Sequence, residues 1–439
     1  MILDRSFFKN VSKLAGSTII AQAIGIITVP VFSRLFSPDV VGQFYLLTSL
    51  VGIVGVFSTG RYEFAIMLPK EDKKAISLVY GSTLICLIVS VLSLFAIYLF
   101  RNSIVKIGDY DKIGDYLFFV PVFVFVAGFI KISTYWCNRK ERFGLNAVIT
   151  LVTSIVSKFG NILFGFWGFV SALTLIVINL VVQCIELLLR ALAFRKDSKP
   201  IRKSENIAFK DIKSSLVEYK KFPLVDLWNG FLDQGSILIV PVVLSVFFTT
   251  SDVGLYSQAM QIVQLPIAIV AGAFGQVFFK KFTDVSSDDS SQVISESFAT
   301  LAIFSFPIFT ILGIFGESIF SWFLGEQWAI SGLYAQILAP WCCFKMVFSP
   351  LSTFFEAKQK QDIFLYITMA TLLTRVVSIV VGGLLGSCLL AVVLFGLTGL
   401  LINVLGIVIL FKMSNTHLSD VMASSRVLIS KIKAIVLKR

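Results

Sequence analysis

The chain consists of long apolar runs that alternate with short polar segments. The first run covers residues 14–32, a turn follows at residues 34–39, and a second run covers residues 40–58. Each run is long enough to cross the roughly 30 Å core of a bilayer as a helix of about 20 residues. The pattern therefore predicts pairs of membrane-spanning helices joined by short turns.

Ten further runs repeat this plan, so we expect an all-α polytopic membrane protein with twelve transmembrane helices in two six-helix lobes. The expected spans are 14–33, 40–60, 77–100, 116–136, 145–166, 168–190, 223–247, 254–279, 297–323, 332–355, 363–385 and 387–411. With 56% hydrophobic residues and a mean hydropathy of +0.88, the chain is too apolar to be buried in a soluble core.

The distribution of basic residues predicts the orientation of the chain. Of its 38 Lys and Arg residues, only four fall in the expected outer loops: Arg34, Arg101, Lys106 and Lys112. Basic residues collect in cytoplasmic loops, so both termini are expected in the cytoplasm. The net charge of +12 reflects this topology, and no nucleic-acid partner is expected.

We expect four regions along the chain. They are an N-terminal lobe (1–194), a basic cytoplasmic linker (195–221), a C-terminal lobe (222–411) and an amphipathic cytoplasmic tail (412–439). Phe209, Ile212, Leu216 and Tyr219 recur at helical spacing in the linker. Both the linker and the tail can therefore form helices that lie on the anionic inner leaflet.

A short internal repeat relates the two halves. The segment from Val41 to Phe44 matches the segment from Val253 to Tyr256, and a proline precedes each glycine by twelve or thirteen residues (Pro30 and Pro241). With six spans per half, both halves start on the same face of the membrane. This predicts a parallel repeat, as in two-lobed transporters.

Charged residues deep inside spans are candidates for a binding site, because each costs about 2.5–3.5 kcal/mol on insertion scales unless it faces a cavity or a partner. Lys158, Lys345 and Arg375 are the basic candidates, and Asp226 and Asp233 share one face of the seventh span. Lys158 lies on a polar stripe with Thr150, Ser154, Ser157 and Asn161. Three cations and two carboxylates predict a hydrated lumen of net positive charge.

Structural roles remain alternatives for these charges. Lys158 can pair with Asp233 to hold the lobes together, because intramembrane charges usually pair with one another. Lys131 lies near the inner boundary, from where it can extend to the interface. Glu186 and Arg190 are expected to form an interfacial i,i+4 pair.

A positively charged lumen favours an anionic cargo, since Arg grips phosphate oxygens in pairs and Lys adds a point charge. Trp136, Trp228 and Trp341 can offer stacking faces for sugars, although interfacial or packing roles are the alternative. The acids Asp226 and Asp233 can carry protons or ions through a transport cycle. No catalytic triad, metal cluster or phosphate loop occurs, so neither an enzymatic activity nor a cofactor is expected.

Residues 14–18, 30–39 and 61–69, together with Gln22 and Gly42, resemble the start of Wzx-type flippases, which translocate O-antigen and other polysaccharide repeat units. These proteins belong to the multidrug/oligosaccharidyl-lipid/polysaccharide (MOP) superfamily. The resemblance implies a MATE-like pair of six-helix lobes in the bacterial inner membrane. It implies alternating access that moves undecaprenyl-diphosphate-linked oligosaccharide from the cytoplasmic to the periplasmic leaflet. Arg61 and Glu63 lie in the matching stretch, and we interpret them as a gate.

Membrane lipid and the polysaccharide polymerase machinery are the further partners that the resemblance implies. Three alternatives remain open: a cation-coupled multidrug exporter of the same superfamily, a lipid II flippase, and a membrane-embedded glycan polymerase. The exporter should have an acidic or apolar pocket, and the lipid II flippases have fourteen spans. A polymerase should carry a large catalytic outer loop, whereas the longest outer loop here is residues 101–115.

Overall fold

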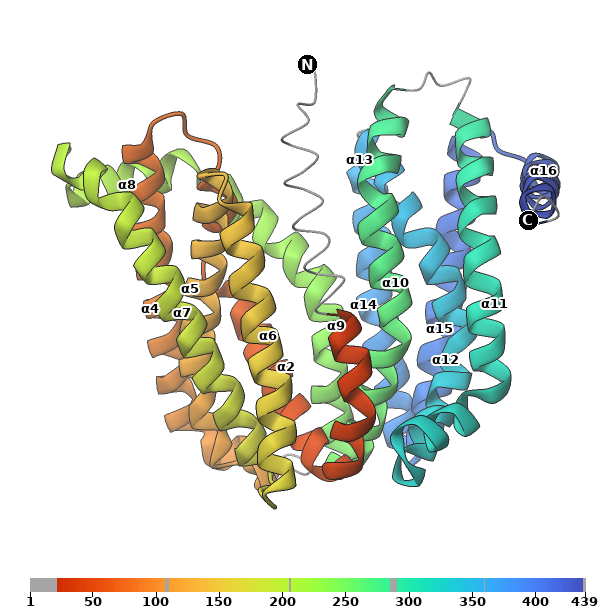
Figure 1. The fold of residues 1–439 in the computed structure, drawn as a ribbon, viewed down its shortest axis with the longest axis horizontal. Helices are drawn as coiled ribbons and strands as arrows, with labels where there is room; N and C mark the ends of the chain where they lie inside the picture. The colour runs from red at the N-terminus through yellow and green to blue at the C-terminus, as the bar shows by residue number, and fades with distance from the viewer. Residues whose placement is uncertain (1–21, 107–109, 205–206, 285–289, 359, 437–439) are drawn as a thin grey trace. The chain divides into compact units, whose positions relative to one another are not determined.

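The computed structural model describes residues 22–106, 110–204, 207–284, 290–358 and 360–436 (Figure 1). Within these ranges every regular element is a helix. Eleven candidate membrane spans are present, built on α2, α4, α5, α6, α7, α9, α10, α11, α12, α14 and α15. A shorter apolar helix, Gln22–Leu35, is the described part of the first expected span, whose residues 14–21 lie outside the described ranges. The prediction of an all-α, multi-pass membrane protein is confirmed.

The chain divides into two compact units, Met1–Gly254 and Leu255–Arg439. In the first unit the helix Gln22–Leu35 is followed by α2 (Pro38–Phe57), α3 (Tyr62–Ala65), α4 (Asp72–Val105), η1 (Tyr110–Ile113), η2 (Tyr116–Phe118), α5 (Phe119–Arg139), α6 (Phe143–Phe166), α7 (Ala172–Ser204), α8 (Phe209–Glu218), η3 (Phe222–Asp226) and α9 (Leu227–Phe247). The expected boundary of the lobes at residues 195–221 stays a prediction.

The second unit contains most of α10 (Thr250–Asp284), whose first turn belongs to the first unit. It continues with α11 (Ser290–Leu324), η4 (Glu326–Trp328), α12 (Ala329–Leu351), α13 (Thr353–Ala357), α14 (Gln361–Leu384), α15 (Cys388–Met413) and α16 (Leu418–Val436). Its core is rich in aromatic side chains, among them Phe278, Phe282, Phe354 and Phe355.

Local sequence determines where α2 begins. The Ser37 hydroxyl accepts a hydrogen bond from the Val40 amide at 3.4 Å, and Pro38 occupies the first helical turn. Serine satisfies an otherwise unpaired amide at a helix start, and proline is tolerated there because its missing N–H would have no partner. The turn at residues 34–39 therefore ends one helix and starts the next.

The second span is broken near its C-terminal end. α2 stops at Phe57, and Gly60 and Arg61 both adopt left-handed backbone conformations, with φ of 58° and 62°. Glycine adopts this region without steric cost, whereas a residue with a Cβ does so only when surrounding contacts hold it. α3 resumes at Tyr62. The break replaces the continuous helix that we expected over residues 40–60.

The helix expected in the basic linker is present as α8, but it does not lie free on a surface. The Leu216 carbonyl accepts a hydrogen bond from the Tyr62 hydroxyl at 2.8 Å, and Leu216 and Tyr219 pack against a core of α3, α4 and α5. The Asp211 carboxylate accepts a hydrogen bond from the Ala208 amide and forms an ion pair with Lys73. Both contacts lower the pKa of the Asp211 carboxyl. Only Phe209 of the expected apolar face is strongly exposed.

Candidate functional site

Arg61 is the first residue of the expected gate, and its partner is Asp226. Their side chains approach to 3.6 Å between Nε and Oδ2. The guanidinium also lies 5.2 Å from the centre of the Phe64 ring and presses on Gly230, where a methyl group would overlap it. Asp226 ends the π-helical turn η3, a type of irregularity that often marks functional positions. Two irregular backbone segments, the α2–α3 break and η3, thus meet at one ion pair.

Glu63, the second expected gate residue, is buried and takes a different partner. It is 3% exposed and accepts a short hydrogen bond from the Thr59 hydroxyl. Nearby, Lys131 donates to the Gly55 carbonyl at 3.2 Å and interacts electrostatically with Glu63. Lys131 therefore turns inward to the C-terminal end of α2, a favourable place for a cation, and does not extend to the interface.

Lys158 lies on α6, against the helix Gln22–Leu35, with its ammonium directly over Gly25. Among the described residues it makes no ion pair or hydrogen bond. Asp233, the partner considered for it, is exposed on α9 and forms no ion pair with it. The alternative of a structural Lys158–Asp233 ion pair is therefore wrong for the structure described.

The polar stripe expected around Lys158 is divided among different neighbours. Ser157 donates to Asn179 of α7 at 2.7 Å, whereas Thr150 belongs to a network around Arg190. Asn161 is 8% exposed, and its side-chain oxygen has no hydrogen-bond partner among the described residues. Lys158 and Asn161 are thus members of the stripe that keep unused bonding capacity among the described residues.

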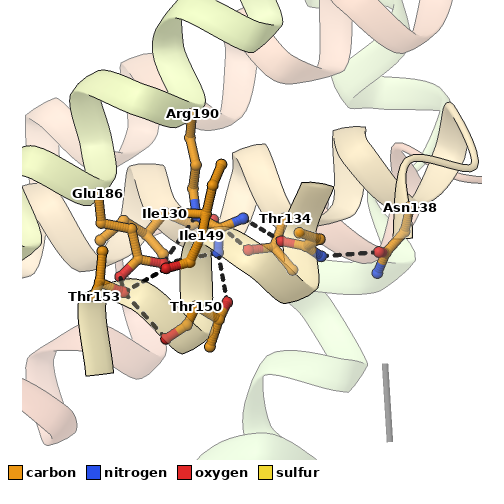
Figure 2. A network of polar contacts seen from close by, with 9 residues as sticks. Ile130, Thr134, Asn138, Ile149, Thr150, Thr153, Glu186 and Arg190 are labelled. Carbon is orange, nitrogen blue, oxygen red and sulfur yellow. Dashed lines mark hydrogen bonds and ion pairs between the residues drawn. The ribbon is translucent and has the colours of Figure 1, made fainter. Parts of the chain in front are cut away.

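Arg190 is the centre of a buried network in which α6 and α7 meet (Figure 2). It is 2% exposed, and it donates to Glu186 through Nε at 2.9 Å and Nη2 at 2.8 Å. It also donates to Thr150 at 2.9 Å and to Asn146. Thr153 binds the other Glu186 oxygen at 3.2 Å.

The network extends to a third helix, because Asn146 donates to Asn138 of α5 at 3.0 Å. From the sequence we expected only the i,i+4 contact of Glu186 with Arg190 at an interface. The partners on α6 lie 44 and 40 residues away in sequence, so no local spacing could reveal them. With its charge balanced by Glu186 and four of its five N–H donors bonded, Arg190 is a structural cation.

Lys345 and Arg375 converge on Trp341 in the second unit. The Lys345 ammonium lies 5.0 Å from the ring centre and donates to Gln264 at 3.1 Å. The Arg375 guanidinium lies 5.7 Å from the same ring and 5.5 Å from Phe395. Cations within about 6 Å of an aromatic face are attracted by the ring quadrupole. The structure therefore brings together two of the three expected basic residues, from α12 and α14.

The three tryptophans considered for sugar stacking have different environments. Trp136 is fully buried in the core of the first unit, and Trp341 is 1% exposed between the two cations. Trp228 is 56% exposed and lies near Phe57 on α2. Of the three, only Trp228 has a face open to a ligand.

The repeated glycines, Gly42 and Gly254, meet near the N-terminal ends of α2 and α10 in the first unit. A methyl group on Gly42 would overlap the Thr250 carbonyl, and one on Gly254 would overlap the Pro38 carbonyl. Pro38 precedes Gly42 by four residues, and Thr250 precedes Gly254 by four residues, so the two contacts are equivalent. This reciprocal contact gives the sequence match a physical cause, because only glycine allows two helix starts to approach so closely.

A polar cluster around Asp39 accompanies this contact. Thr250 and Lys112 both donate to Asp39 Oδ1, the second at 3.1 Å, and Gln43 donates to Oδ2 at 2.9 Å. Lys112 also approaches the Thr250 hydroxyl at 3.3 Å. The cluster joins α2, η1 and the first turn of α10. The sequence marked its glycines but did not single out Asp39 or Thr250.

Comparison with solved structures identifies the fold class. The chain has the fold of MOP-superfamily membrane transporters. It is similar to the lipid II flippase MurJ in an inward closed conformation, with a TM-score of 0.74 and 15% identity over 97% of this chain and 92% of that one. It is also similar to an inward-facing multidrug resistance MATE family transporter, with a TM-score of 0.69 and 14% identity over 93% and 99% of the chains. A third similar structure is a MOP-superfamily transporter from Pyrococcus furiosus, with a TM-score of 0.58 and 12% identity over 93% of this chain and 96% of that one.

The family of the chain follows from its sequence. The model of the polysaccharide biosynthesis protein family matches residues 31–333, which is more than half of the chain. The chain belongs to this family. The comparison with curated proteins gives no match. The expectation of a polysaccharide biosynthesis family is thereby confirmed, and the fold is that of MOP-superfamily transporters.

Proposed function

We propose that this protein flips an undecaprenyl-diphosphate-linked oligosaccharide from the cytoplasmic to the periplasmic leaflet, without catalysing a reaction. The observation that carries the proposal is the match to a polysaccharide biosynthesis family in a chain with a transporter fold. One protein with this fold is a lipid II flippase, and we carry the flipping of a lipid-linked substrate over to this chain. The proposed location is the bacterial inner membrane, with both termini in the cytoplasm.

Three buried or half-buried cations support a diphosphate cargo. We propose that Lys158, Lys345 and Arg375 bind the diphosphate-sugar head while the polyprenyl tail stays in lipid. Lys158 has no ion-pair partner among the described residues, and Lys345 and Arg375 are held over aromatic rings. Cations held in this way can exchange a weak contact for a strong charge-assisted bond to phosphate.

The membrane potential favours this direction of movement. An inside-negative potential of 100 mV contributes about 2.3 kcal/mol for each elementary charge that crosses the membrane. A diphosphate head carries at least two negative charges outward in the proposed cycle. The potential therefore favours outward movement of the head.

We assign the gate and the coupling step to acids and a cation of the first unit. Arg61 pairs with Asp226, and we propose that this contact, with Glu63 buried beside it, opens and closes the inner entrance. Asp233 is exposed on α9, so it is free to exchange protons or ions. Transport that is indifferent both to the pH gradient and to Asp233→Asn would remove Asp233 from the coupling step.

The decisive experiment is deletion of the protein with a glycan readout. Cells should lose surface polysaccharide and accumulate lipid-linked repeat units on the cytoplasmic side of the membrane, measured by extraction after periplasmic glycosidase treatment. Accumulation on the periplasmic side would contradict the proposal and indicate a polymerase. In the proposed pathway, the polysaccharide polymerase machinery is a further partner and acts on the repeat unit after it has been flipped.

A charge-reversal series tests the binding residues within the same assay. Lys158→Glu, Lys345→Glu and Arg375→Glu should each abolish complementation while membrane expression is retained. Arg195→Glu is the matched control, because Arg195 is an exposed basic residue at the end of α7. Full activity of the three lumen variants would contradict their proposed role.

A further inference from the structure

A cavity of about 560 Å³ lies in the second unit between the C-terminal helix α16 and the ends of α10 and α11. Its volume is within the range of about 300–1,000 Å³ that is typical of small-molecule sites. All of its described lining residues belong to these three helices, and none is among the binding, gating or coupling residues proposed above. It is therefore a separate site.

The lining changes from apolar to polar across the cavity. Phe274 and Phe278 of α10 form an aromatic wall, with ring centres 5.5 Å apart, and α16 adds Val427. α11 contributes a polar side around Glu296, which is the one charged residue among the described lining residues. Gln292 donates to Glu296 at 3.0 Å and orients its carboxylate. An apolar wall beside one negative charge suits a ligand with a greasy chain and a cationic head.

The position of α16 indicates where such a ligand would come from. Val421 is buried, and Ser291 at the start of α11 contacts Asp420 at 3.5 Å, so α16 is held against α11. Its other side exposes Leu418 and Met422, which are 67% and 59% accessible. A helix with this exposed apolar side is expected to lie in the plane of the membrane interface. This placement of α16 puts the cavity beside it at the depth of lipid headgroups.

We propose that this cavity binds a phospholipid with an amine headgroup, such as phosphatidylethanolamine, as a resident lipid and not as transported cargo. The ammonium pairs with Glu296, and part of an acyl chain packs on Phe274 and Phe278. A phospholipid without an ammonium presents only negative charge to Glu296 and is disfavoured. The bound lipid fills the space under α16 and fastens this helix to α10 and α11.

The first test measures lipid retention by the full-length purified protein. The protein is reconstituted with equal amounts of phosphatidylethanolamine and phosphatidylglycerol, re-extracted in mild detergent and analysed by native mass spectrometry. One phospholipid should resist removal, with a preference of about fivefold for phosphatidylethanolamine, as expected for a single partly exposed ion pair. Glu296→Gln should retain a lipid but lose the preference. No retained phospholipid, or an unchanged preference in Glu296→Gln, would overturn the proposal.

The second test fills the cavity from α16. Ala423→Trp, at a lining position, should abolish the retained lipid, whereas Ser419→Trp, exposed on α16 outside the described lining, should keep it. Circular dichroism and size-exclusion profiles confirm that each variant is folded. Equal retention in both variants, or a retained polyprenyl lipid in place of the phospholipid, would contradict the assignment. Because retention is measured without transport, these outcomes are independent of whether the protein is a flippase.

Discussion

Arg190 and Lys158 are cations on neighbouring helices of the first unit, and their surroundings differ in every respect that matters for function. Arg190 on α7 is fully buried, and its guanidinium binds a carboxylate, an amide and a hydroxyl (Figure 2). Lys158 on α6 rests over Gly25 and has no ion pair or hydrogen bond among the described residues. One helix, α6, contributes to both environments, because it carries Lys158 and also supplies Asn146 and Thr150 to Arg190.

The difference separates a structural charge, which stabilises the fold, from a charge that is able to bind a ligand. A buried cation whose donors are bonded and whose charge is balanced has little to gain from an anionic ligand. A cation with no fixed partner still carries that cost, and an anionic ligand can relieve it. Burial of a charge inside the membrane is thus a weak indicator of a site until its partners are known.

The largest expected effect is on stability, in the Arg190 network. Arg190→Met leaves the mostly buried Glu186 carboxylate without its cation, so the protein should lose about 3 kcal/mol of unfolding free energy. Thermal unfolding in detergent measures the loss. Arg195→Met is the control on the same helix, because Arg195 is exposed, and it should change stability little. Equal effects of the two substitutions would remove the structural role of Arg190.

A smaller loss is expected at the glycine contact of α2 and α10. In Gly42→Ala the new methyl group overlaps the Thr250 carbonyl, and overpacking of this kind costs about 1–3 kcal/mol. Gly55→Ala on the same helix is the matched control, since no atom lies within 4 Å of its new methyl group. A cysteine introduced near this contact should react faster with a membrane-impermeant reagent, added on the proposed outer side, in Gly42→Ala but not in Gly55→Ala.

The coupling between Glu186 and Arg190 can be measured directly. In a double-mutant cycle of Glu186→Gln and Arg190→Met, the two losses should not add, with an interaction energy of about 0.5–3 kcal/mol. Denaturation of the four proteins supplies the numbers. Additive losses would mean that the pair contributes through packing and not through charge.

Lys158 should behave in the opposite way to Arg190. Lys158→Met removes an uncompensated charge, so stability should be unchanged or rise by about 1 kcal/mol, while flipping activity in cells is lost. Lys158→Arg should retain activity, because the positive charge is kept. Strong destabilisation of the Lys158→Met protein would mean that Lys158 has a structural role like that of Arg190.

The smallest effect is expected at the half-exposed ion pair of Lys112 with Asp39. Exposed ion pairs contribute about 0–1 kcal/mol, so Lys112→Ala should barely change the unfolding temperature. It should nevertheless increase outside labelling near Thr250, because Lys112 contacts both members of the Asp39–Thr250 hydrogen bond. Arg101→Ala, which breaks the Arg101–Asp115 pair nearby in the sequence, is the control and should leave the labelling unchanged.

Hydrophobic runs alone located eleven of the twelve expected spans, because lipid imposes one requirement on every span, namely an apolar helix of sufficient length. The same pattern predicted helical character for residues 209–218 and for the C-terminal tail, where α8 and α16 are found. The parallel repeat inferred from the glycine match stays a prediction. Charges deep in spans were also visible, since Lys158, Lys345 and Arg375 interrupt apolar sequence.

Which charges are satisfied was decided only by tertiary structure. Arg190 obtains Asn146 and Thr150 from a helix more than 30 residues away, and Arg61 obtains Asp226 because a broken helix and a π-helical turn meet. Lys345 and Arg375 share Trp341 through the packing of α12, α14 and α15. The physical reason is that burial depends on hydropathy, which is local, whereas the partner of a polar group depends on which helices touch and in what register.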